Sequence, residues 1–305
     1  MVDSSRNWLE QFQFTFVKAL KAFVYVGAEI EFYLRPLSED STAQPIDAEA
    51  LAAFCQEYHL PIERIDQEAG ELQFEAVFSP VMNGVTLCDQ IIQFKQGIAA
   101  PLKNLGYRVD FSAVPMDGQI GNGMHFHLSL LTVPHGQNLY QKSSSKEDET
   151  ASLKASVAGL LATMPESMIF FCPQPEALKR FISHVSVAAR MCWGGNNRTV
   201  ALRLPDCTLL PEKRRIEHRI ASADADPYLV LSAIMVGIHY GMTQQLTVGP
   251  KVHGNAFDKM YGEAPYNYPP FPRDYNQVLQ WSKEGVILEQ YELKPISSNN
   301  KEDAQ

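Results

Sequence analysis

Hydrophobic residues recur with two different periods in the first part of the chain. Trp8, Phe12, Phe16 and Leu20 are spaced four apart, as on the buried face of an amphipathic helix. Alternating phenylalanines in the same stretch would also suit a strand, but the longer stripe favours the helix. The next segment, residues 25–34 (YVGAEIEFYL), is rich in β-branched and aromatic residues, which predicts a strand.

The rest of the chain mixes helical and extended patterns. Asp47 can cap a helix that begins at the next residue. This helix is expected over residues 48–58, and other helices over 84–105, 151–164 and 227–242. Extended segments are expected over 65–78, 124–130, 199–204 and 214–220. The polar stretch 143–150 predicts a loop. Because the elements do not alternate as regular βαβ units, the pattern predicts an α+β fold with a largely antiparallel sheet.

Composition and charge narrow the function classes. The chain has 305 residues, of which 45% are hydrophobic, so collagen-like and wholly disordered proteins are excluded. The formal net charge of −9 argues against nucleic-acid partners, because their backbone is also negative. No apolar stretch approaches the ~20 residues that span a bilayer, and polar residues interrupt the N-terminal stretch. We therefore expect a cytoplasmic protein with no membrane partner.

The five cysteines stand far apart and form no C-x-x-C pair. Disulfides and a cysteine-based zinc site are therefore not expected. The spacing predicts reduced thiols in or near the core.

Two carboxylates interrupt the apolar strand over residues 25–34. Glu29 and Glu31 are two residues apart, so both project from one face of the strand. Like charges about 7 Å apart on a half-buried face oppose folding unless a cation lies between them. The alternative is that they form the solvent-exposed face of an edge strand.

A second acidic group, EAGELQFE, spans residues 68–75. Glu71, Gln73 and Glu75 are expected to share one strand face, and Glu68 precedes them beside a glycine. The third group, GNGMHFHLSL, spans residues 121–130 and carries two histidines and a serine on alternate positions. These side chains lie opposite a wholly apolar face, which favours a functional surface over a core.

The fourth group is basic. Arg215, Glu217 and Arg219 are expected on one face of the extended segment 214–220, and Arg198 and Arg203 precede it. A solvated charged strand is the plain alternative. Several guanidinium groups together can grip phosphates bidentately, and carboxylates with one histidine suit Mg²⁺ or Mn²⁺. This combination suggests phosphoryl transfer from a nucleoside triphosphate, although no P-loop motif is present.

These groups, in this order, resemble the catalytic domain of the glutamine synthetase family, including its γ-glutamyl-polyamine ligases. The matching segments are YVGAEIEFYL, EAGELQFE, GNGMHFHLSL, NNRTVALRLP, RRIEHRIASADADPYLVLSA and GNAFD, spread over residues 8–291. The resemblance implies a glutamine synthetase/guanido kinase-like fold, with a curved, largely antiparallel sheet and flanking helices. We expect one such domain over residues 1–295 and a disordered tail over 296–305.

The resemblance also implies roles for individual residues. Two Mg²⁺ or Mn²⁺ sites are expected, one from Glu31, Glu68 and Glu75 and the other from Glu29, His125 and Glu217. The nucleotide and its phosphates are expected to contact His127, Ser129, Arg198, Arg203 and Arg215. The amino-acid substrate is expected to contact Arg180, Arg219 and the backbone around Gly121.

The implied activity is that of an ATP-dependent carboxylate–amine ligase. A substrate γ-carboxylate would attack the terminal phosphoryl group of ATP, and an amine would displace phosphate from the resulting acyl phosphate. The expected partners are small molecules: ATP, glutamate or a similar acid, and ammonia or an amine. Phosphoryl transfer to a guanidino acceptor is an alternative that no further motif supports.

The sequence departs from the family pattern in several places. The resemblance implies Arg180, Arg219 and Ser186 as the catalytic candidates. Ser186 stands where the family has a flap glutamate that binds and deprotonates the attacking ammonium, and a serine has neither its charge nor its basicity. We also expect the N-terminal β-grasp domain and the C-terminal helices of the family to be missing, which disfavours the family's ring-shaped homo-oligomer. Phe257 replaces a regulatory tyrosine. The alternative function is therefore an impaired relative that acts as a nucleotide- or metal-binding regulatory subunit.

Overall fold

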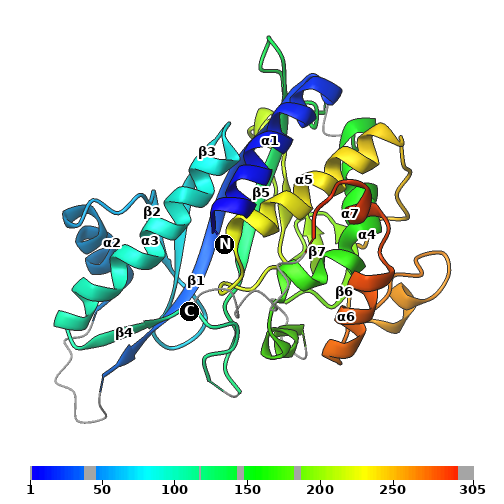
Figure 1. Cartoon of the computed structure of the whole chain (residues 1–305). Helices are drawn as coiled ribbons and strands as arrows, with labels where there is room; N and C mark the ends of the chain where they lie inside the picture. The colour runs from blue at the N-terminus through cyan, green and yellow to red at the C-terminus, as the bar shows by residue number, and fades with distance from the viewer. Residues whose placement is uncertain (1, 38–45, 117, 143–147, 182–186, 295–305) are drawn as a thin grey trace, which may run out of the picture.

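The computed structural model describes residues 2–37, 46–116, 118–142, 148–181 and 187–294. Within them, eight strands form one sheet in the order β2-β3-β1-β5-β8-β7-β6, and β4 pairs with the end of β1. All pairs are antiparallel except β6 with β7 (Figure 1). The strands are β1 (Ala22–Pro36), β2 (Arg64–Gln67), β3 (Gln73–Val81), β4 (Tyr107–Asp110), β5 (Met124–Thr132), β6 (Arg190–Gly194), β7 (Val200–Arg203) and β8 (Ile216–His218).

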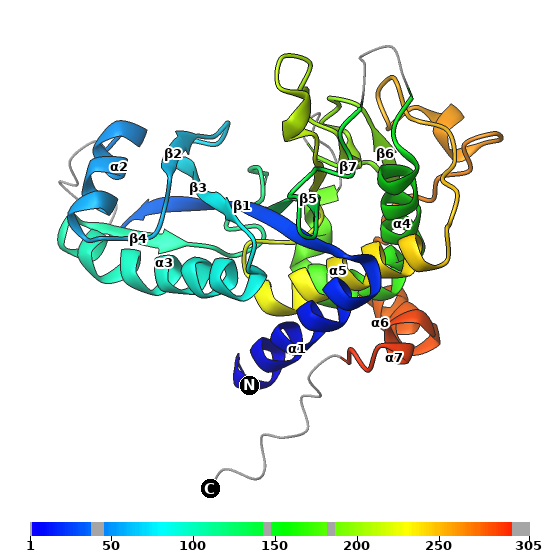
Figure 2. The ribbon, with the colours of Figure 1, turned by 90° about the horizontal axis from the view of Figure 1, so that it is seen from above.

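Helices cover one side of this sheet. Figure 2 shows α1, α3 and α5 on the same side of β1. The α-helices are α1 (Val2–Leu20), α2 (Ala48–Glu57), α3 (Gly84–Asn104), α4 (Ala151–Phe171), α5 (Pro227–Thr243), α6 (Tyr275–Glu284) and α7 (Ile287–Gln290). Short 3₁₀ helices span Pro175–Phe181, Pro211–Lys213 and Lys259–Gly262. The predicted α+β fold with a largely antiparallel sheet is confirmed.

Local sequence explains most helix boundaries. The Asp47 carboxylate accepts a hydrogen bond from the backbone N–H of Ala50 at 2.8 Å, so the predicted cap of α2 is confirmed. Asn83 and Thr150 cap α3 and α4 in the same way. The four-residue stripe near the N-terminus lies in α1, and Phe16 on that stripe is fully buried, so the helical prediction is confirmed there.

Helices α4 and α5 pack closely against each other. A Cβ atom on Gly159 would lie 2.0 Å from the carbonyl oxygen of Gly237, and one on Gly241 would lie 2.1 Å from the carbonyl oxygen of Ala155. The two helix backbones therefore come into direct contact at these glycines, which have no side chain to keep them apart.

Three details differ from the sequence predictions. The stretch 65–78 is not one extended segment, because a turn separates β2 from β3, and Glu71 lies in that turn rather than on the strand face. Gly70 permits the turn, since a Cβ atom there would overlap the Tyr33 hydroxyl at 2.1 Å. The helix predicted over 151–164 continues to Phe171, with Pro165 inside it.

The edge-strand alternative for Glu29 and Glu31 is also wrong. Strand β1 is central and pairs with β3 on one side and β5 on the other. Four of the five cysteines are free and buried, as predicted, while Cys207 is partly exposed. In the described part of the chain, no helix is both long and apolar enough to span a membrane.

Candidate active site

Strand register brings the predicted acidic and histidine residues together. Glu29 of β1 lies directly opposite His125 of β5, and Glu31 lies opposite Glu75 of β3. Residues opposite each other on neighbouring antiparallel strands project from the same face. The same face of β8 adds Glu217. These side chains line a cavity of about 590 Å³.

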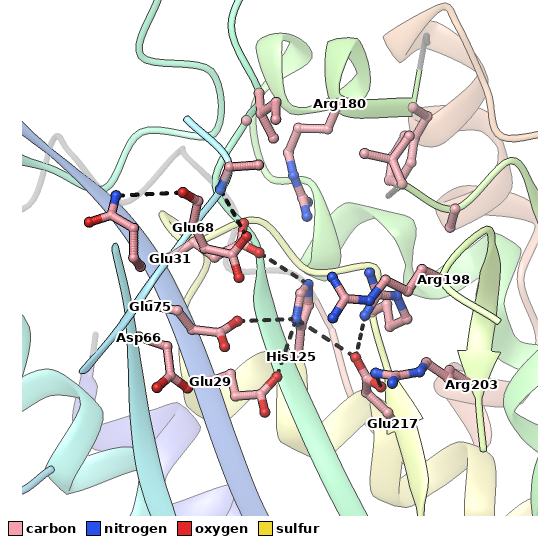
Figure 3. A pocket seen from close by; sticks show the side chains of 18 of the residues that line it. Glu29, Glu31, Asp66, Glu68, Glu75, His125, Arg180, Arg198, Arg203 and Glu217 are labelled. Atoms are coloured by element: carbon pink, nitrogen blue, oxygen red, sulfur yellow. Dashed lines mark hydrogen bonds and ion pairs between the residues drawn. The ribbon is translucent and has the colours of Figure 1, made fainter. Parts of the chain in front are cut away.

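His125 lies at the centre of the carboxylates. Its Nδ1 atom is 3.7 Å from Glu29 and 3.9 Å from both Glu75 and Glu217, and its Nε2 atom is 3.9 Å from Glu31. Figure 3 shows Glu29, Glu31 and Glu75 on one side of the imidazole and Glu217 on the other. His125 is therefore the side chain that all four carboxylates share.

Two groups of these side chains could hold a metal ion. Glu29, His125 and Glu217 form one group, and Glu31, Glu75 and His125 form the other, each with ligand atoms within 4.8 Å of one another. Carboxylate oxygens with one imidazole suit Mg²⁺ or Mn²⁺ better than a structural Zn²⁺. Glu68 lines the same cavity but belongs to neither group among the described residues.

Crowding of the carboxylates changes their protonation. Burial, together with the charges of Glu29 and Glu31, raises the pKa of Glu75 to about 10. Burial, reinforced by the charge of Glu31, also raises the pKa of Glu68. These groups resist ionisation as long as no cation balances their neighbours, and a bound divalent ion would supply that balance.

Two other carboxylates behave in the opposite way. Burial alone would raise the pKa of Glu29, but the neighbouring imidazoles of His125 and His127 outweigh it and lower that pKa. Burial likewise opposes ionisation of Glu217, yet the charge of Arg219 and those of the two histidines bring its pKa down to about 2. Glu29 and Glu217 are therefore ionised at neutral pH.

Arginines form the opposite wall of this cavity. The Arg203 guanidinium donates to Glu217 at 2.6 Å, and Arg219 donates to the other oxygen of the same carboxylate. Arg180 is half-buried, donates to the carbonyl oxygen of Ile220 at 2.9 Å and lies against Gly121. Arg198 lines the same cavity (Figure 3). Such an arrangement presents positive charge to an anion that enters between the two walls.

The remaining predicted residues line a second cavity of about 860 Å³, which also borders Glu29. His127, Ser129 and Arg215 line it, and Nε of Arg215 donates to Nδ1 of His127 at 3.1 Å. Ser129 donates to the carbonyl oxygen of Arg214 at 2.9 Å. The predicted nucleotide residues thus divide between two adjoining cavities.

Several side chains at these cavities were not singled out from the sequence. Arg64 and Asp66 of β2 line the first cavity and form an ion pair at 2.9 Å. Gln73 donates to Asn122 at 3.1 Å and to the carbonyl oxygen of Gly121 at 3.2 Å, so it braces the glycine segment. In the sequence, the EAGELQFE motif was the only sign that Gln73 belongs to the site. Ser186 lies outside the described residues.

Comparison with known proteins shows which family the chain belongs to. A family model described as the catalytic domain of glutamine synthetase matches residues 33–293. Gamma-glutamylputrescine synthetase PuuA of Escherichia coli K12 is 32% identical over 200 residues, which cover 66% of this chain and 41% of that protein. Glutamate–methylamine ligase of Methyloversatilis universalis is 28% identical over 218 residues, which cover 69% and 47%.

Solved structures agree with the fold. A structure described as a GmaS/ADP complex has a TM-score of 0.77 at 22% identity and covers 94% of this chain and 69% of that chain. One described as a novel glutamine synthase homolog has a TM-score of 0.74. The chain spans less than half the length of the two curated relatives named above. Because the catalytic-domain model matches most of its residues, this chain belongs to the glutamine synthetase family.

Proposed function

We propose that this chain carries the catalytic site of an ATP-dependent carboxylate–amine ligase that forms a γ-glutamyl amide. The observation that supports it most is the pair of carboxylate–histidine groups centred on His125, facing Arg203 and Arg219 across one cavity. Relatives that are named as γ-glutamylputrescine synthetase and glutamate–methylamine ligase support the same reaction class. The proposed catalytic domain covers residues 1–295.

The nucleotide would occupy the second cavity, with its phosphates directed toward Glu29. His127 and Arg215 line this cavity, His127 beside Glu29, and both are placed to contact phosphate oxygens. The apolar wall of this cavity, which includes Tyr25, Val77 and Leu131, suits the faces of a purine base. The acid substrate would enter the first cavity, where Arg180 and the Gly121 backbone line the wall.

The chemistry follows from charge neutralisation and positioning. Divalent ions held by Glu29, His125 and Glu217, and by Glu31, Glu75 and Glu68, would neutralise the triphosphate when bound. Arg203 and Arg198 would stabilise charge on the transferred phosphoryl group. The substrate γ-carboxylate oxygen attacks the terminal phosphorus and ADP leaves. An amine nitrogen then attacks the acyl carbon, loses a proton and releases inorganic phosphate.

Phosphate release tests the proposal. The protein is incubated with Mg²⁺, ATP and glutamate, together with ammonium, methylamine, ethanolamine or putrescine in separate reactions. We expect phosphate and the γ-glutamyl amide in equal amounts with at least one amine. Arg203→Met should lower the rate about 10²-fold, whereas Arg273→Met, an exposed arginine outside both cavities, should leave it unchanged. No product with any amine would refute the ligase assignment.

Ser186 favours a second candidate, a regulatory subunit that binds nucleotide and metal without turnover. A serine hydroxyl has neither the charge nor the basicity of the glutamate that the family pattern has there. Ser186→Glu separates the two functions. Amide synthesis with ammonium that appears only in this variant would count against the regulatory role. Nucleotide binding without turnover in both forms would favour the regulatory role.

A further inference from the structure

A buried ion cluster lies beside the second cavity without lining it. Glu149, immediately before α4, is 5% exposed and accepts hydrogen bonds from Nε and Nη2 of Arg214, the former at 3.2 Å. Nζ of Lys251 donates to the same carboxylate at 2.8 Å. Burial would raise the pKa of Glu149, but these two partners outweigh it and lower that pKa. The carboxylate is therefore ionised and held on two sides.

Arg214 is held along its backbone as well as by its side chain. Its carbonyl oxygen accepts from Ser129 at 2.9 Å and from Asn138 at 2.8 Å. Its Nη1 atom donates to the carbonyl oxygen of Pro205 at 3.4 Å. The backbone of Arg214 is therefore attached to Ser129 of β5, and its guanidinium is attached to Glu149 in the segment before α4.

The next residue along the chain reaches the proposed nucleotide site. Arg215 lines the second cavity, and its Nε donates to Nδ1 of His127. An arginine side chain is long and has many rotamers. The direction in which the Arg215 guanidinium points therefore depends on how firmly the backbone of Arg215 is held. Arg214 supplies that support, and Glu149 is the only carboxylate paired with Arg214 among the described ion pairs.

We propose that Glu149 is a positioning residue for nucleotide binding: by anchoring Arg214, it holds the backbone that aims Arg215 at the nucleotide phosphates. This inference rests on the proposed function, because it requires that the second cavity binds a nucleotide. Glu149 lines neither cavity, and of its two partners only Arg214 is next to a residue that lines the second cavity. Lys251 shares the carboxylate, lines neither cavity and lies 5.3 Å from the centre of the Trp193 ring.

Titration calorimetry with the full chain tests this role. ATP is titrated into protein saturated with Mn²⁺, and Mn²⁺ is titrated separately without nucleotide. Glu149→Gln should weaken ATP binding about tenfold, as expected for a disturbed charge-assisted contact, and leave Mn²⁺ binding unchanged. Asp148→Asn is the matched control, since that neighbouring carboxylate is 74% exposed and pairs with Lys154. It should change neither affinity.

A third variant separates positioning from plain stability. Lys251→Met removes the other partner of Glu149 while Arg214 keeps its pair. It should lower the thermal midpoint and leave ATP affinity within twofold of wild type. Equal losses of ATP affinity in Lys251→Met and Glu149→Gln would overturn the proposal, as would unchanged affinity in Glu149→Gln. If that variant does not fold, Glu149→Asp, which keeps the charge but shortens the reach, takes its place and should also weaken ATP binding.

The outcomes also distinguish this proposal from the proposed function. Wild-type protein that binds ATP, with a Glu149→Gln variant that binds it equally well, would overturn the positioning role alone. Wild-type protein that binds no ATP in the presence of Mn²⁺ would overturn both.

Discussion

Nε2 of His127 lies 3.0 Å from a carboxylate oxygen of Glu29. Nδ1 of the same ring accepts a hydrogen bond from Arg215, so the ring presents Nε2 to Glu29. His127 thus joins the proposed metal side of the site to the proposed nucleotide side. The cavities that the two sides line meet at Glu29.

The first prediction concerns the residue that both metal groups share. His125→Ala removes the one ligand common to the Glu29–Glu217 pair and the Glu31–Glu75 pair. We expect Mn²⁺ affinity to fall at least tenfold at the site of Glu29 and Glu217, which loses one of its three proposed ligands, whereas the site of Glu31, Glu68 and Glu75 keeps its carboxylates and should change less. Calorimetry with Mn²⁺ measures both affinities.

His135→Ala is the matched control, because this histidine is exposed on the loop after β5 and lines neither cavity. Its Mn²⁺ affinity should equal that of wild type. Retention of two wild-type affinities in His125→Ala would show that the ion is held elsewhere.

The second prediction concerns the contact between α4 and α5. Gly159→Ala places a Cβ atom 2.0 Å from the carbonyl oxygen of Gly237, and backbone cannot rotate away as a side chain can. Alanine gains about 1 kcal/mol of helix propensity over glycine, but overpacking of this kind costs about 1–3 kcal/mol and occasionally more. We expect a net loss in the free energy of unfolding, measured in urea.

Gly195→Ala serves as the reference for that measurement. A Cβ atom at Gly195 would meet no atom within 4 Å, so the free energy of unfolding should change by less than about 0.5 kcal/mol. A Gly159→Ala protein as stable as wild type would mean that the two helices are free to separate.

The third prediction concerns the anchor of α1. Asp89 of α3 accepts two hydrogen bonds from Arg6 at 3.0 Å and one from Tyr228 of α5. The bond from Arg6 is the main reason that the pKa of Asp89 lies below its ordinary value of 3.8. The carboxylate therefore contributes stability in full above about pH 3.8, and that contribution disappears as the pH falls through the lowered pKa.

Urea midpoints of wild type and Asp89→Asn test this. We expect the variant to have the lower midpoint between pH 5 and 7, and the difference to shrink below about pH 3.8. Glu10→Gln, which removes an exposed carboxylate 3.8 Å from Arg6, should match wild type throughout. A pH-independent difference would show that Asp89 acts through shape rather than charge.

Much of the secondary structure and the content of the site could be predicted from the sequence. The alternation that places Glu29 and Glu31 on one face, and His125, His127 and Ser129 on another, depends only on the two-residue period of a strand. The helix caps follow from single side chains such as Asp47. The prediction failed at Glu71 because the turn depends on how closely Gly70 approaches Tyr33, a residue far away in the chain.

The sequence by itself determined which chemical groups this protein carries and on which face of each strand they lie, because both follow from residue type and local backbone period. Only the tertiary structure decided that β1 is central, that His125 serves two carboxylate pairs while Glu68 stands apart, and that Glu149 reaches Arg214 across 65 positions of the chain. These relations depend on strand register and on packing between distant segments, neither of which leaves a periodic signal in the sequence.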